Sequence, residues 1–465
     1  MTSESVAPNA EQSALYGDWY GSAPVRAIFS VRERLRAMLT FEVALARAQA
    51  ATGVIPRAAA EAIAAAADAG RLDVDAIVAG TQTTGFPVVA LVAQLARLAG
   101  DDAGRYVHWG ATTQDVLDTA TVLQLRAALP SLGGDLDRTI AALAARAARH
   151  RDDLIAGRTH LQHALPVTFG YVCAIWLAPL LDARERLRAA RERALRLQFG
   201  GAAGTSASLG PRAREVAQRL GAELDLPVPE APWHADRSAF AELACALALT
   251  CGSYAKMATD VALLAQTEVA EVAEPHLPGR GGSSAMPQKR NPVASEYVLA
   301  CTRAVHALSG EMLAAMAGDH QRSTGPYQSE ENTLWRVVVH ASGAFAHGRS
   351  LAEGILVDAQ RMRANVDLTG GRIVSEAVAV ALAAHVGSGD AHAAVERAAS
   401  TALEEKRPLL DVLAADPAVT AYFDRDALAE LLDPERYTGE AGAVVDRVLA
   451  RAARCPSTAK EKERP

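Results

Sequence analysis

The chain has 465 residues, of which half are hydrophobic and only 5% are aromatic. Its 47 basic and 54 acidic side chains give a formal net charge of −7. Because the two signs are mixed along the chain, the charge pattern excludes the basic stripe of a nucleic-acid-binding protein. The length exceeds that of one ordinary compact domain and predicts roughly three.

The apolar residues are mainly Ala, Leu and Val, and because Ala and Leu are strong helix formers we expect an all-α protein. Shorter helices are predicted first, at residues 25–53, 56–69 and 87–99, and the last two begin at a proline suited to a first helical turn. Five long apolar stretches low in glycine follow, at residues 116–150, 167–197, 240–273, 292–316 and 333–354. Stretches of this length predict rods that pack into a bundle.

The pattern predicts three helical domains, with boundaries at 1–107, 108–357 and 358–465. A bundle of such rods exposes much apolar surface when it stays alone, so self-association is expected. The apolar stretch at 241–266 contains Lys256 and Asp260 and is interpreted as a buried helix, not a membrane span. The polar N-terminus lacks the apolar core of a signal peptide, which predicts a cytoplasmic protein.

One loop concentrates residues suited to chemistry, at 278–292, where the sequence is Pro-Gly-Arg-Gly-Gly-Ser-Ser-Ala-Met-Pro-Gln-Lys-Arg-Asn-Pro. Its glycines give backbone freedom, its serines offer hydroxyls, and Lys289 and Arg290 offer positive charge. Asn291 and Pro292 are typical of an N-cap followed by a first-turn proline. Cations and amide donors at a helix start suit a carboxylate ligand. The alternative is a plain flexible linker with solvated charges.

Residues 282–292 match the GSSxMPxKxNP signature of the fumarase/aspartase superfamily. Three further segments agree with it, at residues 110–115 (Gly-Ala-Thr-Thr-Gln-Asp), 157–163 and 199–205. The resemblance covers nearly the whole chain, and residues 197–204 and 232–234 (Pro-Trp-His) are most similar to the bacterial 3-carboxy-cis,cis-muconate cycloisomerases. It implies a homotetramer whose active sites each combine three subunits, a small dicarboxylate substrate, and no cofactor or metal.

The resemblance also implies roles for individual residues. Ser283 would be the base that takes the proton beside a carboxylate, and a positive environment would be needed to hold its alkoxide. Lys289 and Asn291 would hold that carboxylate, and Arg322 would clamp a second acidic group. The other substrate-binding residues implied by the resemblance are Thr112, Thr113, Gln114, Thr159, Ser284 and Met286.

Two residues depart from the cycloisomerase pattern. His160 stands where cycloisomerases carry tryptophan, and Glu296 stands where they carry a small residue. Fumarases and adenylosuccinate lyases have a histidine and a glutamate there, and in them the carboxylate orients an imidazole that protonates a leaving group. The alternative is that His160 is a satisfied polar residue and Glu296 a helix-dipole residue. The run at 327–332, Tyr-Gln-Ser-Glu-Glu-Asn, also departs from a Trp-His-Ala-Glu-Trp type run.

From this pair we expect a lyase that performs β-elimination on a small substituted succinate. The broken bond would be C–N or similar, with an amine or nitro leaving group, and the product would be fumarate. The alternatives are a 3-carboxy-cis,cis-muconate cycloisomerase and a catalytically silent scaffold. His160 and His163 stand three residues apart without a third ligand cluster, so no metal site is expected.

Overall fold

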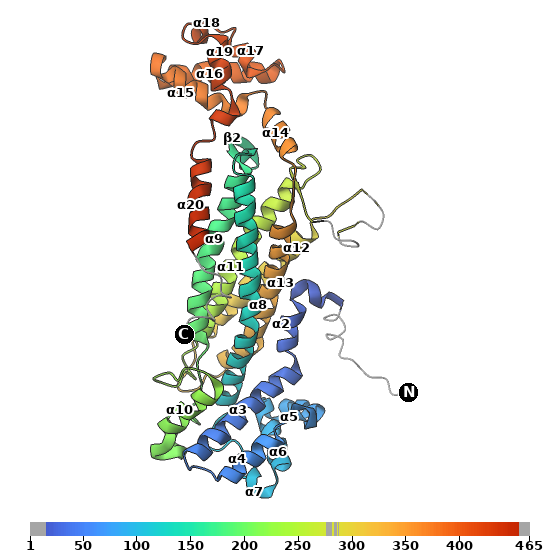
Figure 1. Cartoon of the computed structure of the whole chain (residues 1–465), viewed down its shortest axis with the longest axis vertical. Coiled ribbons are helices and arrows are strands. Elements are labelled where there is room, and N and C mark those ends of the chain that lie inside the picture. The colour runs from blue at the N-terminus through green and yellow to red at the C-terminus, as the bar shows by residue number, and fades with distance from the viewer. Residues whose placement is uncertain (1–14, 276–280, 283–285, 287, 455–465) are drawn as a thin grey trace. The chain divides into compact units, whose positions relative to one another are not determined.

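The computed structural model describes residues 15–275, 281–282, 286 and 288–454, and these residues are mostly helical. Five long helices dominate the chain: α8 (Thr113–Arg149), α9 (Phe169–Ala194), α11 (Ser238–Leu264), α12 (Val293–Ala314) and α13 (Pro326–Gly354). Figure 1 shows all five as extended rods. The all-α class and the five predicted rods are therefore confirmed. The expected rod at 240–273 is wrong beyond Leu264, because the chain turns there and the amide of Glu271 bonds back to the Leu264 carbonyl.

The chain divides into two compact units. The first consists of Met1–Asp135, Ala183–Gly252 and Tyr297–Ala346, and the second of Leu136–Asp182, Ser253–Glu296 and His347–Pro465. Each of the five long helices contributes a segment to both units. The division into three domains therefore stays a prediction.

The first unit contains the shorter helices near the N-terminus and, after α9, one short 3-10 helix followed directly by an α-helix. Their bounds are α2 (Ala23–Ile28), α3 (Val31–Ala51), α4 (Arg57–Ala66), η1 (Ala69–Arg71), α5 (Val74–Thr84), α6 (Pro87–Ala99), α7 (Asp101–Gly104), η2 (Ala207–Arg212) and α10 (Ala213–Leu224). The single helix expected at 25–53 is two, because the Ser30 side chain caps the amide of Glu33 and starts α3 anew. Helix α6 begins at Pro87 as predicted.

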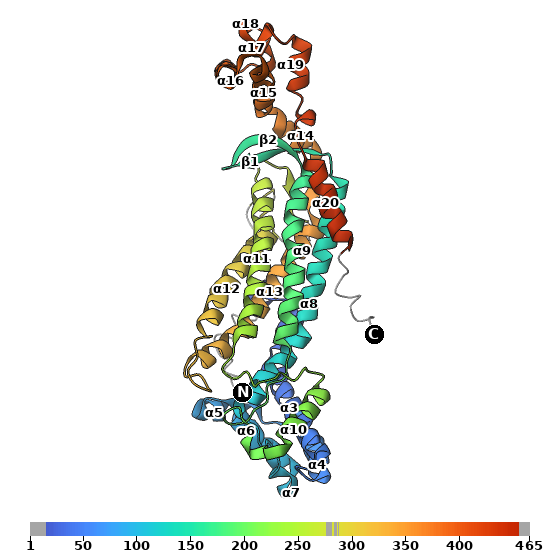
Figure 2. The ribbon, with the colours of Figure 1, turned by 90° about the vertical axis from the view of Figure 1, so that its left-hand side faces the viewer.

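The second unit adds two small antiparallel sheets and a C-terminal helical cluster. The strands are β1 (Leu154–Thr159) with β2 (Gln162–Thr168), and β3 (Val272–Ala273) with β4 (Leu356–Val357). The helices are α14 (Ala359–Asp367), η3 (Arg372–Val374), α15 (Ser375–Val386), α16 (Ser388–Glu404), α17 (Leu409–Leu413), α18 (Pro417–Thr420), α19 (Arg425–Leu431), η4 (Pro434–Arg436) and α20 (Ala441–Arg454). Figure 2 shows the β1–β2 hairpin beside α14.

Apolar side chains fill both units. The largest fully buried ones are Trp176, Tyr254, Phe41, Phe169, Phe240 and Phe345. Tyr254 packs directly on Gly348, where an added Cβ would lie 2.1 Å from the tyrosine ring, so only glycine fits that position of α13. Among the described helices, α11 alone is long and apolar enough to cross a membrane, but 61% of its most apolar stretch is buried, as in the core helix of a soluble protein.

Candidate active site

Thr112 and Arg322, two of the predicted substrate-binding residues, meet in the first unit. Thr112 lies just before α8, and its hydroxyl accepts a hydrogen bond from Arg322 Nη1 at 3.1 Å. Arg322 Nη2 donates to the Ala202 carbonyl at 2.7 Å and to the Gly201 carbonyl at 3.3 Å. A guanidinium carries five N–H donors, so these three acceptors leave it able to bind a carboxylate as well.

Gln114 is turned into the protein, with only 2% of its surface exposed. Its Nε2 donates to the His234 carbonyl at 3.0 Å, whereas its Oε1 has no hydrogen-bond partner. Thr113, the first residue of α8, is half-buried. The structure thus brings Thr112 and Arg322 into contact, whereas Gln114 contacts the segment at His234.

The predicted residues Thr159 and His160 lie at the tip of the β1–β2 hairpin, in the second unit. Thr159 pairs with Gln162, and the two residues between them, His160 and Leu161, have φ angles of 52° and 64°. A two-residue hairpin turn with both φ values positive normally uses Asn-Gly, so a His-Leu turn stores backbone strain. The side chains of His160 and Leu161 are both exposed, so they are accessible to a substrate or to another protein chain.

His163 is the second histidine of this hairpin. Its Nδ1 is buried without a hydrogen-bond partner. Burial and the nearby Arg158 charge lower the pKa of His163, since both disfavour the imidazolium. Among the described residues, no group of three or more His, Cys, Asp or Glu side chains is arranged to hold a metal.

The signature loop is described only in part. Ser283 and Ser284 lie outside the described residues, whereas Met286 and Lys289 are exposed. The loop closes on itself, because Gly282 and Arg290 form an antiparallel bridge and the Asn291 amide donates to the Gly281 carbonyl at 3.0 Å.

The start of α12 differs from the prediction, in which Asn291 caps the helix and Pro292 lies in its first turn. The helix begins at Val293, and its free amides are capped by a carboxylate from another segment, Glu274. Glu274 accepts hydrogen bonds from the amides of Ala294 and Ser295 at 2.9 and 2.8 Å, and from the Ser295 hydroxyl at 2.7 Å. The amide donors expected for a substrate carboxylate are therefore occupied by Glu274. Sequence reasoning missed Glu274, whose only signal was an acidic residue shortly before a glycine-rich loop.

The predicted pair of His160 and Glu296 is not joined within one chain. Glu296 lies in the first turn of α12 and is exposed. Among the described residues, neither a hydrogen bond nor an ion pair links its carboxylate to His160. Because each active site is expected to combine three subunits, the pairing of His160 with Glu296 stays a prediction.

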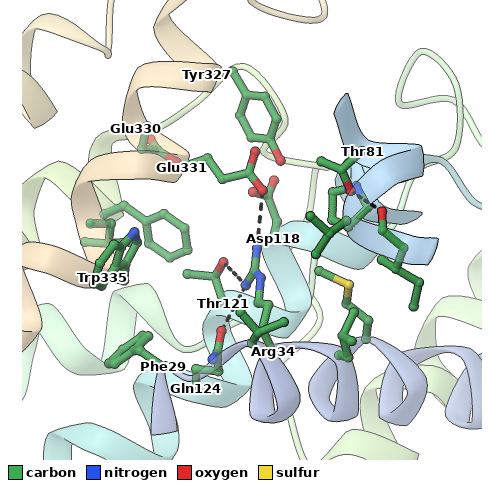
Figure 3. Close-up of a pocket in the computed structure, with 18 residues that line it drawn as sticks. Phe29, Arg34, Thr81, Asp118, Thr121, Gln124, Tyr327, Glu330, Glu331 and Trp335 are labelled. Carbon is green, nitrogen blue, oxygen red and sulfur yellow. Dashed lines mark hydrogen bonds and ion pairs between the residues drawn. The ribbon is translucent and has the colours of Figure 1, made fainter. Parts of the chain in front are cut away.

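A cavity of about 430 Å³ lies in the first unit, apart from all of these residues. Figure 3 shows Arg34 at its floor, where it donates to Thr121 and Gln124 and faces Glu331 at 3.6 Å. The carboxylates of Asp118, Glu330 and Glu331 line it, against the single cation Arg34 among its lining residues. Burial raises the pKa of Glu331, although Arg34 opposes that shift. Arg237 pairs with Asp118 and Glu330, and Arg34 faces Glu331, so neither guanidinium is left to bind a polyanionic substrate in this cavity.

The sequence matches known proteins along most of its length. Residues 20–306 match the family described as Lyase, and residues 371–448 match the adenylosuccinate lyase C-terminus. The 3-carboxy-cis,cis-muconate cycloisomerase of Bradyrhizobium diazoefficiens is 49% identical over 94% of this chain and 98% of its own length. The nitrosuccinate lyase of Streptomyces davaonensis is 42% identical over 94% of each chain.

Solved structures agree with the sequence comparison. The 3-carboxy-cis,cis-muconate lactonizing enzyme from Pseudomonas putida has a TM-score of 0.89 at 42% identity, over 95% of this chain and 99% of its own. The chain belongs to the lyase family of the fumarase/aspartase superfamily. It is an enzyme of that superfamily, and the Bradyrhizobium cycloisomerase is more similar to it in sequence than the nitrosuccinate lyase is.

These relatives correct the functional prediction. Elimination from a substituted succinate to release fumarate is wrong as the main assignment, because the cycloisomerases of Bradyrhizobium diazoefficiens and Pseudomonas aeruginosa are 49% and 47% identical to the chain, whereas the nitrosuccinate lyase is 42% identical. The physical reason is that the prediction depended on His160 and Glu296 acting as one proton-delivering unit. Whether the two residues act together stays a prediction, because the expected sites combine three subunits, and the presence of this pair does not outweigh the similarity of the whole sequence to cycloisomerases.

Proposed function

We propose that the protein is a 3-carboxy-cis,cis-muconate cycloisomerase. The observation that carries this proposal is the 49% identity to the Bradyrhizobium enzyme, over 94% of this chain and 98% of that protein. The cluster of Thr112 and Arg322 supports it, because a partly buried guanidinium with free donors suits a substrate that carries several carboxylates.

In the proposed reaction, an oxygen of one substrate carboxylate attacks a carbon of the conjugated diene and forms the C–O bond of a lactone. The electron pair of the attacked double bond moves toward a neighbouring carboxylate and gives an aci-carboxylate. We propose that Ser283 then delivers a proton to the carbon beside that carboxylate, so the product is an isomer of the substrate. In the reverse direction the same Ser283 is the base.

This chemistry makes a histidine acid unnecessary. In the reverse direction the leaving group is a carboxylate, whose ordinary pKa of about 4 lets it depart without a proton. An amine leaving group, by contrast, needs one. We therefore propose that His160 is a substrate-contacting residue, and that Thr159 lies beside it.

The remaining residues are proposed to neutralise charge. Lys289 and Asn291 would stabilise the aci-carboxylate, with Ser284 and Met286 beside them, and Arg322 with Thr112 and Thr113 would bind a second carboxylate. Gln114 is 2% exposed and its Nε2 donates to the His234 carbonyl, so it would support this site without contacting the substrate. We further propose a cytoplasmic homotetramer in which three subunits contribute to each site. Exposed apolar side chains on the long helices support association, among them Ile175, Leu313 and Trp335.

The test is direct. Purified protein is incubated with 3-carboxy-cis,cis-muconate, and loss of the diene absorbance is followed together with appearance of the lactone by NMR. Nitrosuccinate is assayed in parallel for nitrite and fumarate. Lactone formation that disappears in Ser283→Ala supports the proposal. Absence of lactone with a folded wild-type protein, or faster turnover of nitrosuccinate, overturns it.

A further inference from the structure

Asp115 is a fully buried carboxylate, with 0% of its surface exposed, in the first turn of α8. One of its oxygens, Oδ2, accepts hydrogen bonds from the amides of Thr112 at 3.0 Å and Gly201 at 2.9 Å. The other, Oδ1, accepts from the Gly200 amide at 3.0 Å and from His234 Nε2 at 2.7 Å. One carboxylate therefore ties together three segments that are far apart in the sequence.

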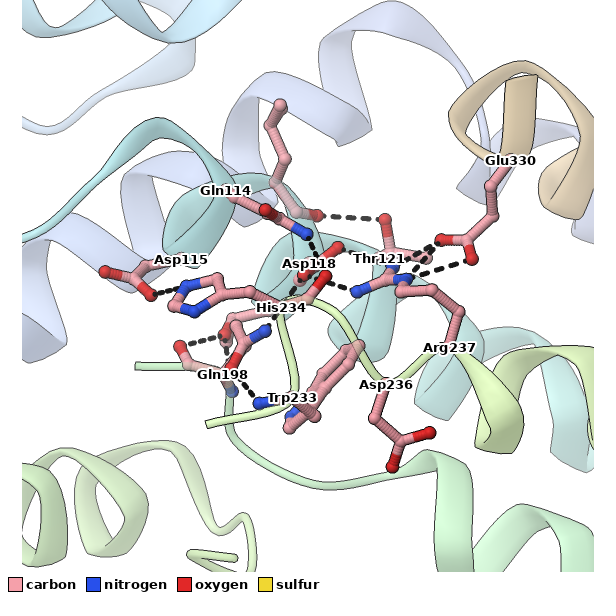
Figure 4. A network of polar contacts seen from close by, with 12 residues as sticks. Gln114, Asp115, Asp118, Thr121, Gln198, Trp233, His234, Asp236, Arg237 and Glu330 are labelled. Carbon is pink, nitrogen blue, oxygen red and sulfur yellow. Dashed lines mark hydrogen bonds and ion pairs between the residues drawn. The ribbon is translucent and has the colours of Figure 1, made fainter. Parts of the chain in front are cut away.

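His234 completes this arrangement from the Pro-Trp-His segment. Figure 4 shows its ring pointing at Asp115, while its backbone carbonyl accepts from Gln114 Nε2 at 3.0 Å. The bond to the carboxylate requires the hydrogen on Nε2. The next residue toward the N-terminus, Trp233, anchors the segment because its Nε1 donates to the Leu197 carbonyl at 2.9 Å. His234 is 4% exposed and cannot reach a ligand itself.

Arg322 depends on the same two backbone segments. Its guanidinium donates to the Thr112 hydroxyl on one side and to the Ala202 carbonyl on the other. Asp115 fixes the spacing of those acceptors, since it binds the amide of Thr112 and the amides of Gly200 and Gly201. A shift of either segment would therefore move Arg322.

We infer that Asp115 and His234 are positioning residues, which hold the Thr112 loop against the turn at Gly200 and Gly201 so that Thr112 and Arg322 present a preformed carboxylate site. This inference rests on the proposed function, in which Thr112 and Arg322 bind a substrate carboxylate. Neither positioning residue contacts the substrate. Their loss weakens substrate binding by displacing groups that do.

The histidine allows a test with two nearly isosteric variants. A glutamine amide occupies the place of Nε2 and an asparagine amide the place of Nδ1, so His234→Gln keeps the bond to Asp115 and His234→Asn loses it. Hydrogen bonds to charged groups are worth enough to predict a KM increase of about 10- to 100-fold for His234→Asn. The KM of His234→Gln should stay within about threefold of the wild-type KM, because this variant keeps the hydrogen bond to Asp115.

His150 provides the matched control. It is 8% exposed and contacts Asp153 at 2.7 Å, but through Nδ1. There His150→Asn keeps the bond and His150→Gln loses it, and we expect changes in Tm without a change in KM. Equal KM values for the two His234 variants, or a lower Tm with unchanged KM, would overturn the inference.

A double-mutant cycle covers the case in which His234→Asn is too unstable to assay. Asp115→Asn is then combined with Thr112→Val, and binding of tricarballylate is measured by calorimetry. Because Asp115 acts through Thr112, the combined loss of affinity should be smaller than the sum of the single losses. Additive losses would contradict positioning. Since this readout needs no turnover, it separates failure of the inference from failure of the proposed reaction.

Discussion

Arg158 and Glu271 form a two-pronged ion pair near the tip of the β1–β2 hairpin, where Arg158 pairs with His163 in the sheet. Arg158 Nη1 and Nη2 each lie 2.8 Å from a Glu271 oxygen, and Asn365 Nδ2 donates to the same carboxylate at 2.8 Å. Glu271 is fully buried, whereas Arg158 keeps 21% of its side chain exposed. The hairpin that carries His160 is therefore held by one buried carboxylate from the segment before the signature loop.

Glu271→Gln should lower the free energy of unfolding by about 2–4 kcal/mol, because it leaves a largely buried guanidinium without its counter-ion. The matched control is Asp446→Asn, which breaks an equally two-pronged pair with Arg151 that is exposed. It should cost less than about 1 kcal/mol. Urea unfolding measures the free-energy loss of both variants, provided that the m-value does not change. Equal losses would show that the Arg158 pair contributes no more than a surface ion pair.

The sequence predicted the long helices well because apolar periodicity over 20 or more residues is a strong signal. Helices α8 and α9 continue through Pro130 and Pro179, which lie inside the rods predicted at 116–150 and 167–197. A proline inside a helix costs about 3 kcal/mol. Burial of the helix residues on both sides of each proline must offset that cost. The β1–β2 hairpin was missed, because its turn is His160-Leu161 where the usual hairpin signal is Asn-Gly.

The candidate site was predicted less completely. Sequence motifs located Thr112 and Arg322, which do meet, but periodicity cannot show which distant segments a buried carboxylate joins. Asp115 stood inside a quoted motif, and its place three residues after Thr112 is typical of a capping box. Its bonds to Gly200, Gly201 and His234 depend on tertiary contacts alone, so only the structure reveals them.

Ser283→Ala should reduce kcat for lactone formation by about 10³-fold or more, since it removes the proposed proton-transfer group. A loop hydroxyl contributes little to folding, so Tm and subunit number should not change. Ser388→Ala, at an exposed serine that begins α16, is the control and should be as active as wild type. Turnover of Ser283→Ala within tenfold of wild type would remove Ser283 from the mechanism.

His160→Asn should leave lactone formation within about tenfold of wild type, because the departing group of the reverse reaction is a carboxylate that needs no acid. Asparagine tolerates the left-handed conformation better than histidine, so the variant should also be more stable by about 0.5–1 kcal/mol. Leu161→Asn relieves the same kind of strain and tests the stability effect alone. A loss as deep as that of Ser283→Ala would instead make His160 an obligatory proton carrier.

Active sites shared between subunits predict complementation. If Ser283 and Arg322 of one site come from different chains, tetramers mixed from inactive Ser283→Ala and inactive Arg322→Met chains should regain activity. Random mixing at equal amounts makes both residues intact in about a quarter of the sites, which sets the expected recovery. Mass spectrometry of differently tagged chains verifies the mixing. Mixed tetramers that stay inactive would place both residues in one chain.

We expect the contribution of Glu331 to protein stability to decrease as the pH rises. A surface acid paired with a cation behaves in the opposite way. Burial raises its pKa in the folded protein, Asp118 adds to the rise, and Arg34 only partly opposes it. The folded state therefore binds this proton more tightly than the unfolded state, whose glutamate titrates near pH 4.3. The contribution of Glu331 to stability is therefore fully present below about pH 4.3. It is lost as the pH rises through the pKa that Glu331 has in the folded protein.

Glu331→Gln removes the titration and keeps the shape. The variant should gain stability over wild type at pH 7–8 and lose that gain toward pH 4, as measured by Tm across the range. Glu353→Gln is the control, because Glu353 accepts hydrogen bonds from Arg138 at 2.7 and 3.0 Å, which the variant weakens. It should be no more stable than wild type at neutral pH. A Glu331→Gln protein that is less stable at pH 8 than at pH 4, relative to wild type, would mean that Arg34 outweighs burial at this carboxylate.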